Sequence, residues 1–359
     1  MDNSNNNIQS NKERLLWVDY LKAFACLAVV TFHVIYGLQN AGLPTHSYTN
    51  ALKEFCDMFQ IPLFMMASGF LYARAGRIKG SYFKFEAGKL INLGIPYLVF
   101  SYVYIAINTV FASSVNFSYD LRTILRVPIE PVAQYWFLFA LILIFLFIVA
   151  IEKVIKNEYV LFGIMLIWKI LIINMFLLGD KVLNIDYYIA GYGVFFYLGV
   201  FYARRHDDFE FLRNKKVVIT LVAVYLVLFA AYLVRPQMST RVLDMVKLFL
   251  NLLAITSFTL LFEMFWKHFE CGFLKLISKY SFQIYLLHTM ATAALRIVLV
   301  KLGIYNDIIH FVLGMIVGLT ASIIAAVICE KTVVLNILFF PKSTYKKLKK
   351  MKETGNEQS

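Results

Sequence analysis

The chain has 359 residues, of which 60% are hydrophobic and 16% are charged, against about 25% charged residues in an ordinary soluble domain. Its net charge is +13, from 35 Lys and Arg against 22 Asp and Glu residues. A soluble protein of 41.5 kDa could not bury this much apolar surface. The composition therefore excludes a soluble enzyme, a disordered chain and a fibrous repeat, and it predicts an all-α protein that crosses a membrane many times.

About 20 apolar residues cross a bilayer as a helix. On this criterion the sequence predicts ten transmembrane helices, of which the fourth and sixth are short. In chain order they are Trp17–Tyr36, Leu52–Ala73, Leu90–Phe111, Tyr135–Ile151, Tyr159–Leu178, Tyr187–Ala203, Val217–Val234, Met245–Trp266, Tyr280–Val300 and Ile308–Val334. They divide the chain into a disordered N-terminal tail at 1–13, a membrane domain at 14–340 and a basic C-terminal tail at 341–359.

Basic residues concentrate in alternate connections between these helices. One side of the membrane receives both termini and the second, fourth, sixth and eighth connections, which carry most of the lysines and arginines. Because cytoplasmic loops hold the excess of Lys and Arg, both termini are predicted to be cytoplasmic, and the even number of helices agrees. The surplus charge then indicates orientation in a cell membrane and not nucleic-acid binding. Contact of the basic tail with anionic membrane lipids is a second interpretation.

The first predicted helix carries three ionisable residues, which are costly in a membrane and point to function. Asp19 and Lys22 are three residues apart and can form an ion pair. His33 follows eleven residues after Lys22, which returns it to within about 20° of the same face. Asp19 and Lys22 also fit a purely structural role, in which their side chains extend to the cytoplasmic membrane surface. A neutral imidazole suits proton transfer near pH 7, so His33 is the first catalytic candidate.

The ninth predicted helix carries a second polar stripe. Ser281, Tyr285 and His288 follow the spacing i, i+4, i+7 and share one face. In a membrane such a stripe lines a cavity or forms a hydrogen-bonded seam with another helix, and both interpretations stay open.

Three further features stand out in the first four predicted helices. Pro62, Ser68 and Gly69 lie inside the second one and permit a bend or a close helix contact. Pro96 lies inside the third. Trp136 lies at the start of the fourth. There it also fits the belt of aromatic residues at the membrane surface, which is a structural role. The four cysteines lie scattered in apolar surroundings without metal-ligand spacing, so we expect core residues and no metal site.

These motifs, taken in order, resemble the type 3 family of integral-membrane acyltransferases, which O-acylate surface polysaccharides and related glycans. The resemblance covers nearly the whole chain. It rests on a basic residue followed after ten residues by histidine, and on five later elements: Lys22 to His33, Pro62-Leu63-Phe64 with Ser68-Gly69-Phe70, Lys84 and Lys89 before Pro96-Tyr97, Trp136-Phe137-Leu138, Tyr197-Leu198-Gly199, and Ser281 with Ile284-Tyr285 and Leu287-His288. The family's usual arginine is Lys22 here, which keeps the charge but loses the planar fork.

The resemblance implies transfer of an acyl group from cytoplasmic acyl-CoA to a sugar hydroxyl of a polysaccharide or its lipid-linked precursor. The expected acyl group is acetyl, and the expected donor is acetyl-CoA. His33 would act as general base or as acyl carrier, with Lys22 and Asp19 nearer the cytoplasm. Ser281, Tyr285 and His288, with Ser68 and Trp136, would line the substrate path. The basic second connection would meet the CoA phosphates through Arg74, Arg77, Lys79, Lys84 and Lys89.

Two other classes of function compete with the enzyme. A polysaccharide exporter or flippase would fit the membrane helices, but the internal repeat with broken helices in both halves that many transporters show is not evident. A scaffold assembled with polysaccharide-synthesis proteins would not require ionisable residues such as His33 inside the membrane.

Overall fold

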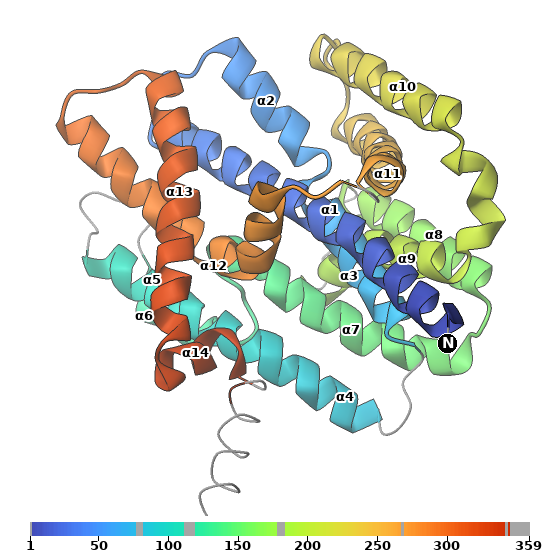
Figure 1. The fold of residues 1–359 in the computed structure, drawn as a ribbon. Coiled ribbons are helices and arrows are strands. Elements are labelled where there is room, and N and C mark those ends of the chain that lie inside the picture. Colours follow the sequence, from blue (N-terminus) through green and yellow to red (C-terminus); the bar gives the residue numbers. More distant parts are fainter. Residues whose placement is uncertain are drawn as a thin grey trace, which may run out of the picture.

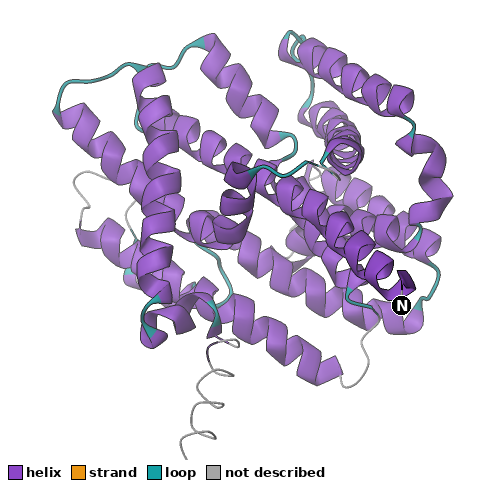
Figure 2. Cartoon of the chain, viewed as in Figure 1, coloured by secondary structure: helices purple, strands orange, loops and turns teal. Residues whose placement is uncertain are grey.

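The computed structural model describes residues 2–76, 82–110, 119–177, 184–266, 269–341 and 344. Within these ranges the regular structure is entirely helical, with no strand (Figure 2). In chain order the elements are α1 (Asp2–Asn40), α2 (Ser47–Asp57), α3 (Gln60–Arg74), α4 (Tyr82–Lys89), the π-helical turn η1 (Leu90–Gly94), α5 (Ile95–Val110), α6 (Leu121–Arg126), the 3₁₀ turn η2 (Ala133–Tyr135), α7 (Trp136–Val154), α8 (Glu158–Leu177), α9 (Asn184–Arg204), the 3₁₀ segment η3 (His206–Arg213), α10 (Lys215–Leu233), α11 (Thr240–Phe265), α12 (Gly272–Lys301), α13 (Asp307–Glu330) and α14 (Val333–Phe339).

Eight helical stretches in the described residues are long and apolar enough to cross a membrane, and they correspond to the first four and the last four predicted helices. They are Leu16–Asn40, Ser47–Arg74, Phe85–Val110, Ala133–Val154, Lys215–Leu233, Thr240–Phe265, Gly272–Lys301 and Asp307–Glu330. The predicted fifth and sixth helices coincide with α8 and α9, of 20 and 21 residues, which are not among the eight. The prediction of an all-α multi-pass membrane protein is confirmed. The count of ten, the cytoplasmic termini and the domain limits stay predictions.

Two prolines explain irregularities in the second and third of these stretches. Pro62 lies in the first turn of α3 and has no N–H to donate to the carbonyl four residues earlier. The chain accordingly divides there, with α2 ending at Asp57 and α3 beginning at Gln60. In the third stretch the π-helical turn η1 lies directly before Ile95 and Pro96, and the wider turn accommodates the missing hydrogen bond.

The outer faces of the helices are apolar. Val227, Ile324 and Ile167 are 68%, 59% and 59% exposed, whereas Ser257 and His288 are completely buried between helices. A water-soluble bundle has the opposite distribution, because large exposed apolar surfaces are costly in water. The arrangement fits a bundle surrounded by lipid, with its polar chemistry in the interior.

Helices α3 and α9 pack backbone against backbone through two glycines. A methyl group at Gly199 would overlap the carbonyl of Met66 and the amide of Phe70, and one at Gly69 would overlap the carbonyl of Phe196. Small residues at such contacts are how membrane helices approach closely. The predicted close helix contact at Gly69 therefore has a partner in Gly199.

We expect Gly199→Ala to destabilise the protein. The added methyl group meets backbone atoms that cannot rotate away, and overpacking of this kind costs about 1–3 kcal/mol. The matched control is Gly191→Ala on the same helix, where an added Cβ meets no atom within 4 Å. Thermal unfolding of the detergent-purified variants should give a lower midpoint for Gly199→Ala only, and equal midpoints would contradict the close contact.

Helices α1, α12 and α13 meet on one side of the bundle, with α13 beside α12 (Figure 1). Gly314 and Gly318 on α13 make this approach possible, since a Cβ built at Gly314 lies 2.8 Å from Val34 on α1 and one at Gly318 lies 2.9 Å from Thr292 on α12. Helices α1 and α12 run parallel and end at the same end of the bundle, where α13 begins. Asp307, the first residue of α13, joins that helix to the start of α2 by accepting hydrogen bonds from the backbone N–H of His46 at 2.8 Å and from the Thr49 hydroxyl at 2.7 Å.

Candidate active site

Two histidines from distant parts of the chain lie side by side within this group of helices. The ring centroids of His33 on α1 and His288 on α12 are 5.1 Å apart, and the ring planes are tilted by 59°. His288 is completely buried, and His33 lines a cavity. The parallel course of α1 and α12 produces this pair, because it aligns the far half of α1 with the middle of α12.

The hydrogen bonds of His288 determine which of its nitrogens carries the proton. Its Nδ1 lies 2.7 Å from the carbonyl oxygen of Ile284 and 3.0 Å from that of Tyr285. A carbonyl oxygen only accepts, so Nδ1 must hold the hydrogen, and Nε2 of the neutral ring has a bare lone pair. Among the residues that the structure describes, the buried Nε2 has no hydrogen-bond partner. An unsatisfied polar atom of this kind is uncommon in a folded protein and marks the site for a functional explanation.

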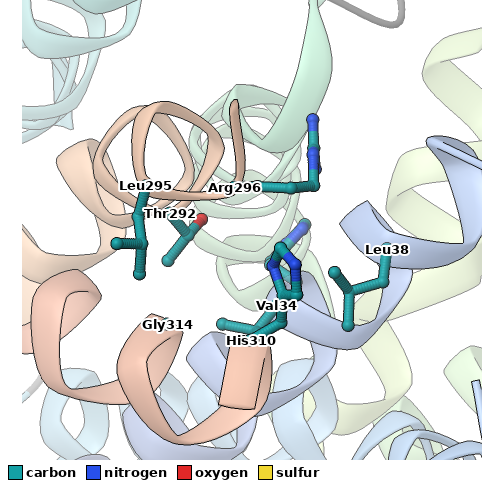
Figure 3. A pocket seen from close by; sticks show the side chains of 8 residues that line it. Val34, Leu38, Thr292, Leu295, Arg296, His310 and Gly314 are labelled. Carbon is teal, nitrogen blue, oxygen red and sulfur yellow. The ribbon is translucent and has the colours of Figure 1, made fainter. Parts of the chain in front are cut away.

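A cavity lies between α1, α12 and α13, and Figure 3 labels lining residues from all three helices. His33 is also among the residues that line it. The lining atoms of the cavity surround about 240 Å³ of non-atom space, which includes space open to the surroundings. Its lining comes from α1, α12 and α13 and comprises His33, Val34, Leu38, Thr292, Leu295, Arg296, His310 and Gly314. In the part of the chain that the structure describes, no group of three His, Cys, Asp or Glu side chains is placed to hold a metal ion.

Arg296 and His310 belong to this cavity although the sequence analysis did not single them out. His310 is 3% exposed, and its Nε2 donates to the carbonyl of Ile304 at 2.9 Å. The side chain of Arg296 crosses to α1, where a methyl group at Gly37 would collide with its Nη1.

A sequence signal for the α12 residues was present. Continuing the stripe from Ser281 by eleven and fifteen residues leads along the same helix face to Thr292 and Arg296. Both line the cavity. His310 has no comparable signal, because it lies near the start of a different helix and reaches the cavity only through the contact of α13 with α1.

The other two members of the predicted stripe lie in contacts between and within helices. The hydroxyl of Tyr285 donates to the carbonyl of Gln134 at 2.5 Å, and its ring meets Phe137 edge to face with centroids 5.4 Å apart. Ser281 donates to the carbonyl of Ser278 on its own helix at 2.9 Å. Neither is in the cavity lining. The seam interpretation thus describes the surroundings of Tyr285. His288 is also outside the cavity lining, and its ring contacts His33, which does line the cavity.

Asp19 and Lys22 form the ion pair that their spacing allows, with Lys22 Nζ 2.7 Å from Asp19 Oδ1. Both are partly exposed. Eleven helical residues separate Lys22 from His33, which is about 16 Å along the axis. The structure therefore does not bring this pair to the cavity.

The two remaining substrate-lining candidates lie outside the cavity lining. Ser68 is partly buried on α3, next to Gly69. Trp136 begins α7 and packs against Tyr192 and Tyr188, with ring centroids 4.8 Å and 6.2 Å away.

The structure describes part of the predicted CoA-binding loop. Arg74 is exposed in the last turn of α3. The ammonium group of Lys89 lies over the ring of Phe145, 3.9 Å from its centroid. Lys84 belongs to α4, but the described residues do not include its side chain, and Arg77 and Lys79 lie outside them altogether.

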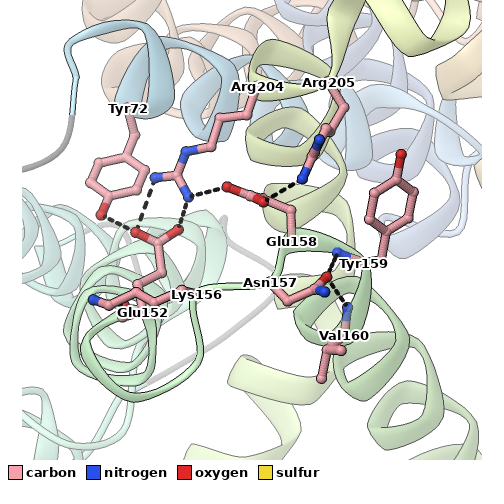
Figure 4. Close-up of polar contacts among 9 residues, drawn as sticks. All are labelled: Tyr72, Glu152, Lys156, Asn157, Glu158, Tyr159, Val160, Arg204 and Arg205. Carbon is pink, nitrogen blue, oxygen red and sulfur yellow. Dashed lines mark hydrogen bonds and ion pairs between the residues drawn. The ribbon is translucent and has the colours of Figure 1, made fainter.

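A network of ion pairs and hydrogen bonds joins α3, α7, α8 and α9 (Figure 4). Arg204 donates to both carboxylate oxygens of Glu152 at 2.8 and 3.1 Å, and the Tyr72 hydroxyl donates to the same carboxylate at 2.8 Å. Glu158 pairs with Arg205 at 3.3 Å and with Arg204 at 3.9 Å. These two arginines are neutralised by carboxylates, so their arrangement suits a structural joint between helices.

Comparison with known proteins gives one finding. The family model described as an acyltransferase domain matches residues 15–327, from the first turn of α1 that carries described side chains almost to the end of α13. No curated protein and no solved structure matches the chain. The matched region contains the histidine pair, the cavity and the ion-pair network.

Proposed function

The chain belongs to the type 3 acyltransferase family, and we propose that it transfers an acyl group, acetyl in the first place, from acyl-CoA to a sugar hydroxyl of a cell-surface polysaccharide or its lipid-linked precursor. The family and the apolar helices make it a membrane acyltransferase. The donor, the acceptor and the place in the cell membrane are the proposal.

The pairing of His33 with His288 beside a cavity is the observation that carries this mechanism. In the proposed step, His33 takes the proton from the acceptor hydroxyl while that oxygen attacks the thioester carbonyl carbon. The carbon–sulfur bond then breaks, and the departing CoA sulfur takes the proton back from the imidazolium of His33. Acyl transfer from a thioester needs a positioned acceptor and a group that transfers its proton. The histidine pair beside the cavity is proposed to provide both.

His288 fits the role of a positioning residue for His33. A general base works best when a third group orients it, and the bare, buried Nε2 of His288 is an acceptor for the N–H of the His33 ring, whose centroid lies 5.1 Å from that of His288. That contact would direct the other nitrogen of His33, with its lone pair, toward the cavity. The same geometry also fits transient attachment of the acyl group to His33, the second route considered from the sequence.

The donor is proposed to bind at the opposite end of α1. CoA carries several phosphate groups, and the exposed Arg74 belongs to the most basic connection of the chain. Arg204 and Arg205 are held by Glu152 and Glu158, so they supply little free positive charge. The pantetheine arm must then thread along α1 from that end toward His33.

Membranes from cells that express the chain, supplied with acetyl-CoA labelled in the acetyl group, test the proposal. We expect label in alkali-labile esters on glycan, above the level in membranes from cells without the chain. Transfer of glycan across the membrane with no ester label would favour an exporter instead. The same reaction run briefly and quenched would leave label on the protein if His33 carries the acyl group.

A further inference from the structure

We propose that Arg296 makes the cavity selective for an acceptor sugar that bears an oxyanion group, a carboxylate or a phosphate, close to the hydroxyl that is acylated. This inference rests on the proposed function, because it names the class of acceptor that His33 would serve.

Arg296 lies in the same cavity as His33, at a contact between α12 and α1. It follows His288 by two turns on α12 and lines the same cavity as His33 (Figure 3). Its guanidinium group lies against Gly37 on α1, one turn beyond His33, at a place that only a residue without a side chain leaves open. An anionic group bound to Arg296 would lie at the same cavity as His33.

Arg296 gives the cavity a positive charge that no acidic lining residue balances. Arginine stays protonated under all ordinary conditions, and a cation inside a membrane bundle is costly unless it is paired. Within the described ranges Arg296 makes no ion pair or hydrogen bond, and none of the residues that line the cavity is acidic. Arg204 and Arg205 differ from Arg296, because each of them forms an ion pair with a glutamate of this chain.

The remaining lining suits a sugar ring. Val34, Leu38 and Leu295 offer an apolar wall to the carbon–hydrogen face of the ring. Because Nε2 of His310 donates to the carbonyl of Ile304, its Nδ1 has a lone pair that can accept from a hydroxyl group. The planar fork of Arg296 can bind two oxygens of one carboxylate or phosphate.

Ligand binding by the detergent-purified full chain tests this inference without any acyl transfer. The probes are methyl β-glucuronide, methyl β-glucoside, which lacks the charge, and inorganic phosphate, which lacks the sugar. Binding to the folded protein raises its thermal midpoint, and at a given ligand concentration the rise is larger for the tighter ligand. We expect the glucuronide to raise the midpoint of the wild type at concentrations where glucoside and phosphate do not.

The variants separate loss of the anion contact from loss of the fold. Arg296→Gln should weaken glucuronide binding by about tenfold or more, the worth of a charge-assisted contact. Arg296→Lys should lie between it and the wild type. The matched control is Arg235→Gln, since Arg235 donates to the carbonyl of Tyr232 in the connection between α10 and α11, and it should bind like the wild type. If Arg296→Gln does not yield folded protein, Gly37→Ala, which displaces the guanidinium group, should show the same loss.

Equal binding of glucuronide and glucoside by the wild type would overturn the inference, as would an Arg296→Gln variant that keeps the preference. Phosphate alone matching the glucuronide would overturn it too, because the site would then bind any anion. The proposed function fails separately: a wild-type chain that prefers the glucuronide but places no label in glycan has the anion site and lacks the acetyl transfer.

Discussion

Replacing His33 with alanine should lower acyl transfer by about 10²–10⁴-fold, the range that a positioned general base contributes. His33 is the ionisable side chain that both lines the cavity and touches the buried imidazole of His288. Removing it leaves the acceptor hydroxyl protonated and un-nucleophilic. The rate is measured as labelled ester formed per amount of folded protein in the membrane.

Gln39→Ala is the control for this substitution. Gln39 is a polar residue on the same helix, but its amide donates to Asn50 on α2 at 2.7 Å and not into the cavity. It should keep transfer close to the wild-type rate. Undiminished activity of His33→Ala at equal membrane amounts would remove His33 from the mechanism, whatever the rest of the site does.

The second large effect is expected at His288. His288→Phe keeps a ring in the buried space but removes the Nε2 lone pair, and we expect kcat to fall by about 10²-fold, the lower end of the contribution of proton transfer. The KM for acetyl-CoA should change little, because the proposed donor contacts lie at the other end of α1. Steady-state kinetics with labelled acetyl-CoA separate the two parameters.

A merely structural role of His288 would give a different result. Ser322→Ala offers the comparison, since Ser322 is 1% exposed and donates to the carbonyl of Gly318 on its own helix at 2.7 Å, much as Nδ1 of His288 does on α12. Loss of such a bond costs about 1 kcal/mol of stability. If both variants lost stability alike and neither lowered the kcat of the folded fraction, His288 would be a structural residue.

Local periodicity accounts for what the sequence predicted well. Asp19 and Lys22 form the ion pair expected from their spacing, because an α-helix determines the neighbours of each residue on its own surface. Pro62 indicated an irregularity in the second helix for an equally local reason, the missing N–H. The long apolar runs predicted the membrane class, and the family match agrees with the motifs.

The contacts between helices could not be predicted from the sequence. The neighbour of His33 is His288, 255 residues later, and nothing in either helix alone states that α1 and α12 run parallel in this register. The approach of α13 depends on Gly314 and Gly318, which bring His310 to the cavity. Helix α9 illustrates the same limit: it packs on α3, α7 and α8, so its glycines and tyrosines reflect protein contacts as much as lipid.

The most direct measurement of the central claim uses the purified chain alone, with acetyl-CoA labelled in the acetyl group and glycan from the expressing strain as acceptor. We expect labelled O-acetyl ester on the glycan with the wild type and with Gln39→Ala, and at least about a hundredfold less with His33→Ala. Equal ester label from wild type and His33→Ala, or none from a folded wild-type chain, would contradict that claim.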